Sequence, residues 1–121
     1  MSRRVVLLVA MAALVFGAGP TVGDIGSCGQ AADDLDGPRF FGAQRETTCA
    51  HCRACSLTTR ACDDACAGRG PVLLPAGCRP IVHDGEVCLR ALDAASCDDF
   101  SAFVRDAAPT APSECQFCPV P

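Results

Sequence analysis

The sequence predicts a small, mostly α-helical, disulfide-stapled domain: two αα-hairpins with an irregular N-terminal arm and a Pro-rich C-terminal tail. Three observations support this expectation. The chain has 121 residues, the length of one small domain. It has eleven cysteines but only six Phe, no Trp and no Tyr, so its apolar core is modest and cross-links are expected to supplement it. Apolar residues in two separate regions recur every three or four positions, the period of an amphipathic helix.

Residues 1–23 have the pattern of a secretory signal peptide. Two arginines precede an unbroken apolar run at 5–16, which is shorter than the roughly 20 residues that span a bilayer. We expect cleavage after Gly23, with Gly17 as the alternative, and the arginine pair also resembles a twin-arginine signal. All ten basic residues are Arg, which is typical of a GC-rich bacterial genome. The sequence thus predicts a secreted, periplasmic or cell-surface bacterial protein whose mature form has no transmembrane span.

Residues 24–45 are predicted to form a loose arm, because they are rich in Gly and Asp and show no helical period. Within this arm, the Asp-Gly-Pro sequence at 36–38 predicts a turn. The two Phe residues at 40–41 are expected to dock the arm on the core.

Cys28, in the same arm, is a candidate lipidation site. The residues Ile25-Gly26-Ser27 before it resemble the motif that precedes the lipidated cysteine of bacterial lipoproteins. The number of cysteines is odd, and lipidation of Cys28 would leave ten of them for five disulfides. Without lipidation, one thiol remains, either unpaired or joined to a second copy of the chain in a disulfide-linked dimer.

Residues 46–121 are predicted to be a cysteine-rich helical domain that begins with an αα-hairpin. One of the threonines at 47–48 caps its first helix, which runs into Ser56. One of the threonines at 58–59 caps its second helix, which ends at Gly68. The hairpin cysteines lie three or four residues apart, so their sulfurs share one face of each helix and can cross-link the two helices. They are Cys49, Cys52 and Cys55 in the first helix, and Cys62 and Cys66 in the second.

The second hairpin follows a Pro-containing loop at 70–80. Asp84 is the candidate N-cap of its first helix, and Ser96 with Asp99 resembles a capping box that begins its second helix. The tail at 108–121 contains four prolines and is not expected to be helical. We interpret the apolar stripe of this hairpin as packed core rather than as a ligand groove. The stripe consists of Val87, Cys88, Ala91, Leu92, Ala95, Phe100, Phe103, Val104 and Ala107.

The main hypothesis for the cysteines is a disulfide framework. Cysteines make up roughly 11% of the residues that follow the signal peptide, a level typical of disulfide scaffolds in oxidising compartments. The pairing itself does not follow from the sequence, although bridges between segments are expected. The candidates are Cys28, Cys49, Cys52, Cys55, Cys62, Cys66, Cys78, Cys88, Cys97, Cys115 and Cys118.

Two alternatives use the same cysteines differently. The spacing of Cys49, Cys52 and Cys55, with a remote Cys118 before Pro119, is similar to the iron–sulfur ligands of bacterial ferredoxins. A structural zinc ion could instead be held by four ligands, which are Cys49, Cys52, Cys62 and Cys66. The second alternative is a thiol–disulfide oxidoreductase, because Cys49-Ala50-His51-Cys52 resembles the redox pair of thioredoxin-like proteins.

Other chemistry has little support. The net charge is −4, which argues against a nucleic-acid partner, because phosphate binding needs a basic patch. His83-Asp84 is interpreted as a turn with a helix cap rather than an acid–base pair. The acidic residues at 33–36 lack the remaining ligands of a calcium loop. We therefore predict no catalytic residues, no metal and no cofactor.

Four segments carry a resemblance to uncharacterised small cysteine-rich secreted proteins and lipoproteins of GC-rich bacteria. They are the export signal with G-P-T-V-G-D at 19–24, the cysteine cluster at 49–66, V-C-L-R-A-L at 87–92 and S-E-C-Q-F-C-P at 113–119. The resemblance implies no activity, because none is assigned to those proteins. The function expected from the sequence is an exported, non-catalytic structural or binding module with an unknown protein or surface partner.

Overall fold

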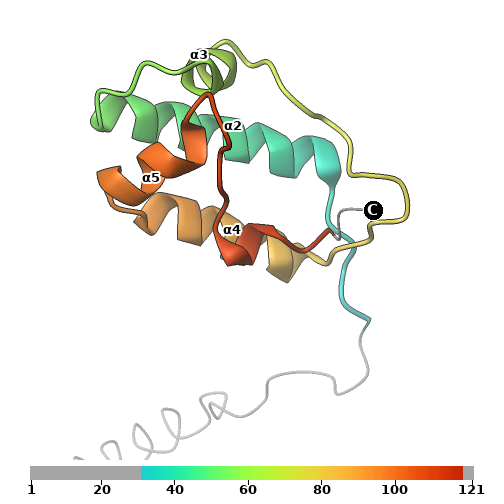
Figure 1. The fold of residues 1–121 in the computed structure, drawn as a ribbon. Coiled ribbons are helices and arrows are strands. Elements are labelled where there is room, and N and C mark those ends of the chain that lie inside the picture. Colours follow the sequence, from blue (N-terminus) through green and yellow to red (C-terminus); the bar gives the residue numbers. More distant parts are fainter. Residues whose placement is uncertain (1–30, 119–121) are drawn as a thin grey trace, which may run out of the picture. The chain divides into compact units, whose positions relative to one another are not determined.

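The computed structural model describes residues 31–118 (Figure 1), and the predicted signal peptide, its cleavage site and Cys28 lie outside this range. The helices of the described residues belong to one compact unit, Ala32–Pro121. They are α2 (Gly37–Ala54), α3 (Arg60–Cys66), α4 (Val82–Ala94), α5 (Cys97–Val104) and the 3-10 helix η1 (Ser113–Cys115). The predicted mostly α-helical, disulfide-stapled fold is confirmed. The described residues contain no strand, only an isolated antiparallel bridge between Asp34 and Ile81.

Helix α2 begins at Gly37, so the predicted start at the threonines at 47–48 is wrong, and the second half of the expected arm is helical. Asp36 is the N-cap, and its Oδ1 accepts a hydrogen bond from the backbone N–H of Arg39 at 2.8 Å. Pro38 lies in the first turn, where its missing N–H costs no helical hydrogen bond and its fixed φ suits the helix. The Asp-Gly-Pro sequence therefore begins a helix instead of forming an isolated turn.

Helices α2 and α3 form the first predicted αα-hairpin. Ser56, just after α2, has a φ of 55°, which lets the chain reverse within a few residues. Thr59 caps α3 as expected, and its Oγ1 accepts a hydrogen bond from the N–H of Cys62 at 3.3 Å. After α3 the chain leaves through Gly68, which has a φ of 71° that favours glycine.

Helix α4 begins at Val82 with Ile81 as its N-cap, three residues earlier than expected. Asp84 lies in the first turn of α4 rather than at the N-cap, and its Oδ2 accepts a hydrogen bond from the N–H of Ile81 at 3.0 Å. A carboxylate at this position still satisfies one of the backbone donors at the start of the helix.

The restart of the chain into α5 was predicted correctly. Ser96 Oγ accepts a hydrogen bond from the N–H of Asp99 at 3.1 Å, and its hydroxyl donates to Asp99 Oδ2 at 2.8 Å. Helix α5 ends at Val104, so Ala107, which was expected to continue the apolar stripe, is exposed beyond the helix.

The four helices pack in a simple arrangement. Helix α4 lies beside α2, while α5 turns back from the end of α4 toward α3 (Figure 1). The Pro-rich tail crosses the molecule and places η1 against α4 (Figure 1). A long connection that contains α3 and an irregular loop joins α2 to α4.

The core is small, and half of its buried hydrophobic residues are cysteines. Phe100 and Cys88 have no exposed surface, and Cys52 and Cys62 are 2% and 3% exposed. Within residues 31–118, the buried hydrophobic residues are Phe40, Cys49, Cys52, Cys62, Cys88, Leu92, Phe100 and Val104. The cystine sulfurs occupy core positions that larger apolar side chains would otherwise fill. The same cysteines therefore both cross-link the helices and pack the core.

The segment before α2 is fixed against the start of α4. The N–H of Leu35 donates to the carbonyl of Pro80, and the N–H of Val82 donates to the carbonyl of Asp33, both at 2.9 Å. The Leu35 side chain lies so close to Gly85 that a β-carbon on this glycine would be 2.7 Å from Leu35 Cδ1. This part of the expected arm is irregular, as predicted, but it packs on the domain.

Five disulfides connect the ten cysteines of the described residues. They are Cys49–Cys66, Cys52–Cys62, Cys55–Cys97, Cys78–Cys118 and Cys88–Cys115. Two lie between α2 and α3, and two hold the tail to α4 and to the loop before it. The remaining bridge, Cys55–Cys97, joins the end of α2 to the start of α5.

Candidate functional site

The cysteine-rich face of α2 is the centre of the candidate site. Cys49 and Cys52 lie on successive turns of this helix, Cys55 is its C-cap, and each has a different partner. The Cα atoms of Cys49 and Cys66 are 4.8 Å apart, and those of Cys52 and Cys62 are 5.8 Å apart. The prediction that bridges connect different segments, rather than Cys49 and Cys52, is therefore confirmed.

The arrangement does not provide the expected alternative ligand sets. Cys49, Cys52, Cys55 and Cys118 are bonded to four different cysteines, so the iron–sulfur set is not assembled. The four zinc candidates lie close together but as two disulfides, whereas a metal ligand must be a thiolate. Within residues 31–118, no group of three or more His, Cys, Asp or Glu side chains could hold a metal ion.

The redox pair proposed for Cys49 and Cys52 is likewise wrong, because both side chains point to α3 and neither sulfur is bonded to the other. Residues three apart on a helix lie on one face, and here a second helix covers that face. Each cysteine therefore pairs across the hairpin instead of along the helix.

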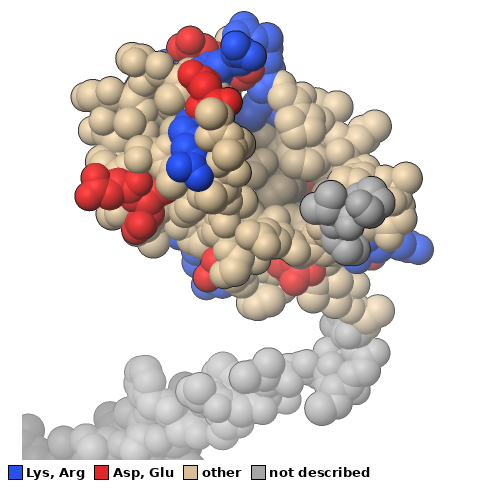
Figure 2. Space-filling model, viewed as in Figure 1, with Lys and Arg blue, Asp and Glu red and all other residues tan. Residues whose placement is uncertain are grey.

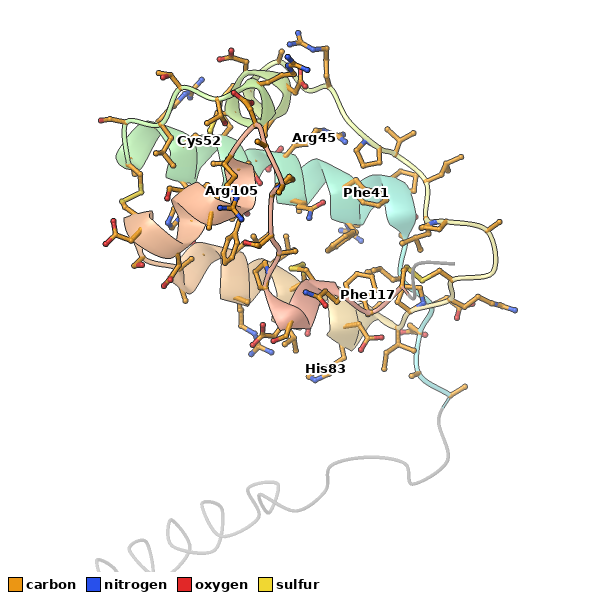
Figure 3. All side chains as sticks on the ribbon, in the orientation of Figure 1. Phe41, Arg45, Cys52, His83, Arg105 and Phe117 are labelled. Atoms are coloured by element: carbon orange, nitrogen blue, oxygen red, sulfur yellow. A yellow bond between two sulfur atoms is a disulfide. The ribbon has the colours of Figure 1, made fainter. Side chains whose placement is uncertain are left out.

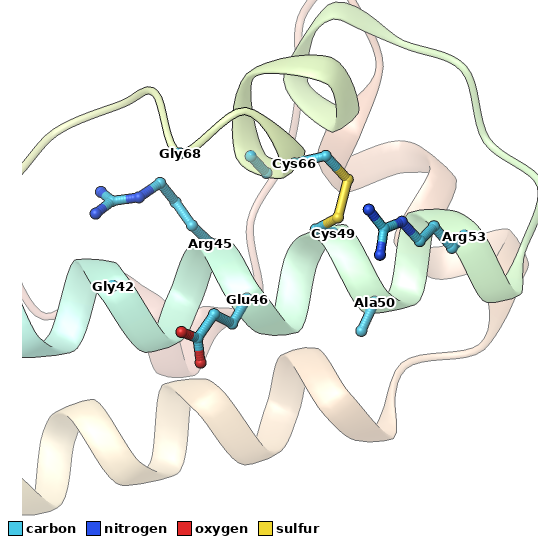
Figure 4. Close-up of a pocket in the computed structure, with 9 residues that line it drawn as sticks. Gly42, Arg45, Glu46, Cys49, Ala50, Arg53, Cys66 and Gly68 are labelled. Atoms are coloured by element: carbon cyan, nitrogen blue, oxygen red, sulfur yellow. A yellow bond between two sulfur atoms is a disulfide. The ribbon is translucent and has the colours of Figure 1, made fainter.

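A hollow of about 470 Å³ opens beside the Cys49–Cys66 disulfide, between α2 and the end of α3 (Figure 4). Its wall on α2 includes Arg45, Glu46 and Arg53. Arg53 lies one turn after Cys49, and in Figure 4 its guanidinium points back toward the disulfide. No signal in the sequence distinguishes these arginines from the charged residues that ordinarily form the solvent-exposed face of a helix.

A second hollow, of about 440 Å³, lies between α2 and α4 at the segment that precedes α2. Leu35, Phe40 and Leu89 give it an apolar lining, and Asp36, Arg39 and Glu86 provide charged groups at its edge. Two apolar residues are also exposed in the loop before α4: Val72 is 52% exposed and Leu73 is 72% exposed. These are the apolar surfaces that a protein partner could cover.

Neither histidine is placed for acid–base chemistry. His51 is half-buried, and its Nε2–H donates to the carbonyl of Ala95 at 2.9 Å, which fixes this tautomer because a carbonyl only accepts. His83 is exposed and points away from the body of the protein (Figure 3). Its neighbour Asp84 is also inside α4, so the predicted turn with an Asp84 cap is wrong, although the Asp84 carboxylate accepts a hydrogen bond from the N–H of Ile81 at the start of the helix.

The acidic residues before α2 have structural roles. Asp36 caps α2, and Asp34 forms an exposed ion pair with Arg79 in which the N–O distance is 3.0 Å. Acidic and basic side chains are interspersed on the face shown in Figure 2. None of the helices in residues 31–118 combines the length and apolar character needed to cross a bilayer. The chain matches no protein-family model, no curated protein and no solved structure.

Proposed function

We propose that this chain is an exported, non-catalytic structural or binding module whose fold depends on its disulfides. The observation that carries the proposal is that five disulfides connect the described residues, and that four of the eight buried hydrophobic residues of their core are cysteines. Such a core is stable only where thiols remain oxidised, which is the condition outside the cytosol. The signal-like residues 1–23 support the same location, which would be the extracellular space, the periplasm or the cell surface.

The partner of this module would be a protein or another surface rather than nucleic acid. The net charge of −4 disfavours phosphate backbones, and the apolar groove between α2 and α4 offers a surface that a partner could cover. Leu35 and Leu89, which are half-buried, would supply the apolar contact, with Arg39 and Glu86 at the rim.

Cys28 would decide whether the module is anchored. The ten cysteines of the described residues pair among themselves. The chain has eleven cysteines, so Cys28 is the one that remains. Its role would be to carry a lipid, to join two chains in a disulfide-linked dimer, or to remain a thiol.

The test is the intact mass of the protein isolated from its native producer and alkylated without prior reduction. We expect a chain with five disulfides that begins at Asp24 and carries an alkyl group or a second chain on Cys28, or one that begins at Cys28 where this residue carries a diacylglycerol. Expression of a Cys28→Ser variant is the control that assigns this last group. A mass with many alkylated thiols, or a chain recovered with residues 1–23 in the cytosol, would contradict the proposal.

A further inference from the structure

The five disulfides differ in how far solvent can reach them. Cys52–Cys62 and Cys88 are almost completely buried. Cys66, in contrast, is exposed, and its partner Cys49 is 9% exposed on the wall of the hollow. Thiol–disulfide exchange requires that a thiolate reach one sulfur of the bond, so the Cys49–Cys66 bridge is accessible to this chemistry.

The charge beside this bridge favours an anionic reagent. The Arg53 guanidinium points toward the Cys49–Cys66 bond (Figure 4), and Arg53 has no ion pair among the described residues. The neighbouring Arg45 lies on the other side of the hollow, where its Nη1–H donates to the carbonyl of Pro71 at 2.7 Å. The carboxylate of Glu46, which also lines the hollow, points away from the sulfurs in Figure 4.

We propose that the Cys49–Cys66 disulfide is an exchange site for small thiols that carry carboxylates. The thiolate of the reagent attacks Sγ of Cys66, a bond forms between these two sulfurs, and Cys49 leaves as a thiolate. A second reagent thiolate attacks the reagent sulfur of the mixed disulfide and releases Cys66. In balance, two reagent thiols are oxidised to their disulfide, and the Cys49–Cys66 bond accepts two electrons and two protons to become two thiols.

The helix positions set the direction of attack. Cys66 is the last residue of α3, where the backbone carbonyls place partial negative charge and disfavour a thiolate. Cys49 lies within α2, and Arg53 is one turn away on the same face, so a thiolate on Cys49 is stabilised. A thiol that is more stable as a thiolate leaves faster, which makes Cys49 the leaving group and Cys66 the site of the mixed disulfide.

The fold can tolerate this exchange because Cys52–Cys62 lies inside the same hairpin. When Cys49–Cys66 opens, the buried inner bridge still connects α2 to α3. The other bridge with an exposed cysteine is Cys55–Cys97, in which Cys97 begins α5 and is followed by Asp98 and Asp99. The two negative charges outweigh the roughly half positive charge at the start of the helix and repel an anionic thiol. The Cys55–Cys97 bridge is therefore an internal control for the effect of local charge on the rate of exchange at Cys49–Cys66.

The experiment uses the full-length protein after its five disulfides are confirmed by intact mass. The protein is incubated with low concentrations of glutathione, alkylated at intervals and mapped by peptide mass spectrometry. We expect glutathione first on Cys66 and the alkyl group first on Cys49, while the other bridges remain closed. If Cys55–Cys97 opens first, or if all bridges open together, the proposal is wrong. The inference rests on the proposed disulfide framework, and the mass before glutathione is added tests that framework separately.

Two arginine variants measure how much the charge of Arg53 contributes to the rate at which glutathione opens the Cys49–Cys66 bridge. Arg53→Gln is expected to slow opening by glutathione about two- to fivefold, the range for one surface charge, but not to slow opening by cysteamine, which is cationic. Arg90→Gln, an exposed arginine of α4, is the matched control and should leave both rates unchanged. The difference should disappear at about 1 M salt, where the Debye length falls to roughly 3 Å. Equal rates for both variants with glutathione would overturn the proposal.

Discussion

The imidazole of His51 on α2 stacks on the ring of Phe100 on α5, with the two ring centroids 4.3 Å apart. The same imidazole donates its Nε2–H to the carbonyl of Ala95, the residue that ends α4. One side chain of α2 thus fixes the turn between α4 and α5 and covers the most buried aromatic ring of the described core.

Replacing this histidine should destabilise the domain. We expect His51→Ala to lower the free energy of unfolding by about 1–3 kcal/mol, because it removes the ring contact and leaves the Ala95 carbonyl without its partner. His83→Ala, at an exposed position on α4, should change it by less than about 0.5 kcal/mol. Urea denaturation of the oxidised proteins measures both values, and equal stability of the two variants would contradict this role for His51.

Two glycines of the helices should respond in opposite directions to the same substitution. Gly85→Ala places a methyl group 2.7 Å from Leu35 Cδ1 and 3.1 Å from Phe40, so we expect a loss of about 1–3 kcal/mol from overpacking. Gly42→Ala in α2 meets no atom within 4 Å and should stabilise the helix by about 0.5–1 kcal/mol. Thermal denaturation followed by circular dichroism should therefore show Tm shifts of opposite sign; shifts of the same sign would refute the packing of Leu35 on Gly85.

The two bridges of the first hairpin should have unequal effects on stability. Each closes a short loop, with sequence separations of 10 and 17 residues, so the entropic effects are similar. Removing Cys52 and Cys62 together by alanine also opens a cavity in the core, and we expect a loss of about 3–5 kcal/mol. Cys49→Ser with Cys66→Ser, at the hollow, should cost only about 2–3 kcal/mol. Guanidinium denaturation of the two double variants tests this order.

Full reduction should unfold the protein. Each native bridge of a small domain contributes on the order of 2–5 kcal/mol, and the remaining apolar core has only four buried residues besides cysteine. In strong reductant, circular dichroism should lose the helical signal at room temperature. Retention of that signal with an unchanged Tm would show that the helices pack without their bridges. Oxidised protein in the same buffer is the control.

Local signals in the sequence were sufficient for several helix ends. Thr59 and Ser96 cap α3 and α5 as predicted, because a Ser or Thr hydroxyl oxygen can accept a hydrogen bond from one of the unpaired N–H groups at a helix start. Asp84 was assigned to the right helix end but to the wrong position, since carboxylates are favoured both at the cap and within the first turn.

The start of α2 was missed because its local signal is ambiguous. Gly37 and Pro38 are typical of a turn, but Asp36 as N-cap and Pro38 in the first turn also favour a helix start, and the burial of Phe40 in the core supports the helix. The pairing of Cys55 with Cys97, 42 residues away, depends on how the hairpins pack and has no local signal. The position of Arg53 beside a cystine was unpredictable for the same reason, because it requires α3 to be placed.

The disulfide connectivity also determines what a protease can release. Two bridges lie within residues 49–66 and two within residues 78–118, so Cys55–Cys97 alone joins these two parts. Arg69 is exposed just after α3, in the connection between them. Cleavage after Arg69 would leave a two-chain molecule whose mass has grown only by one water, and the chains would separate only when a reductant opens that single covalent link.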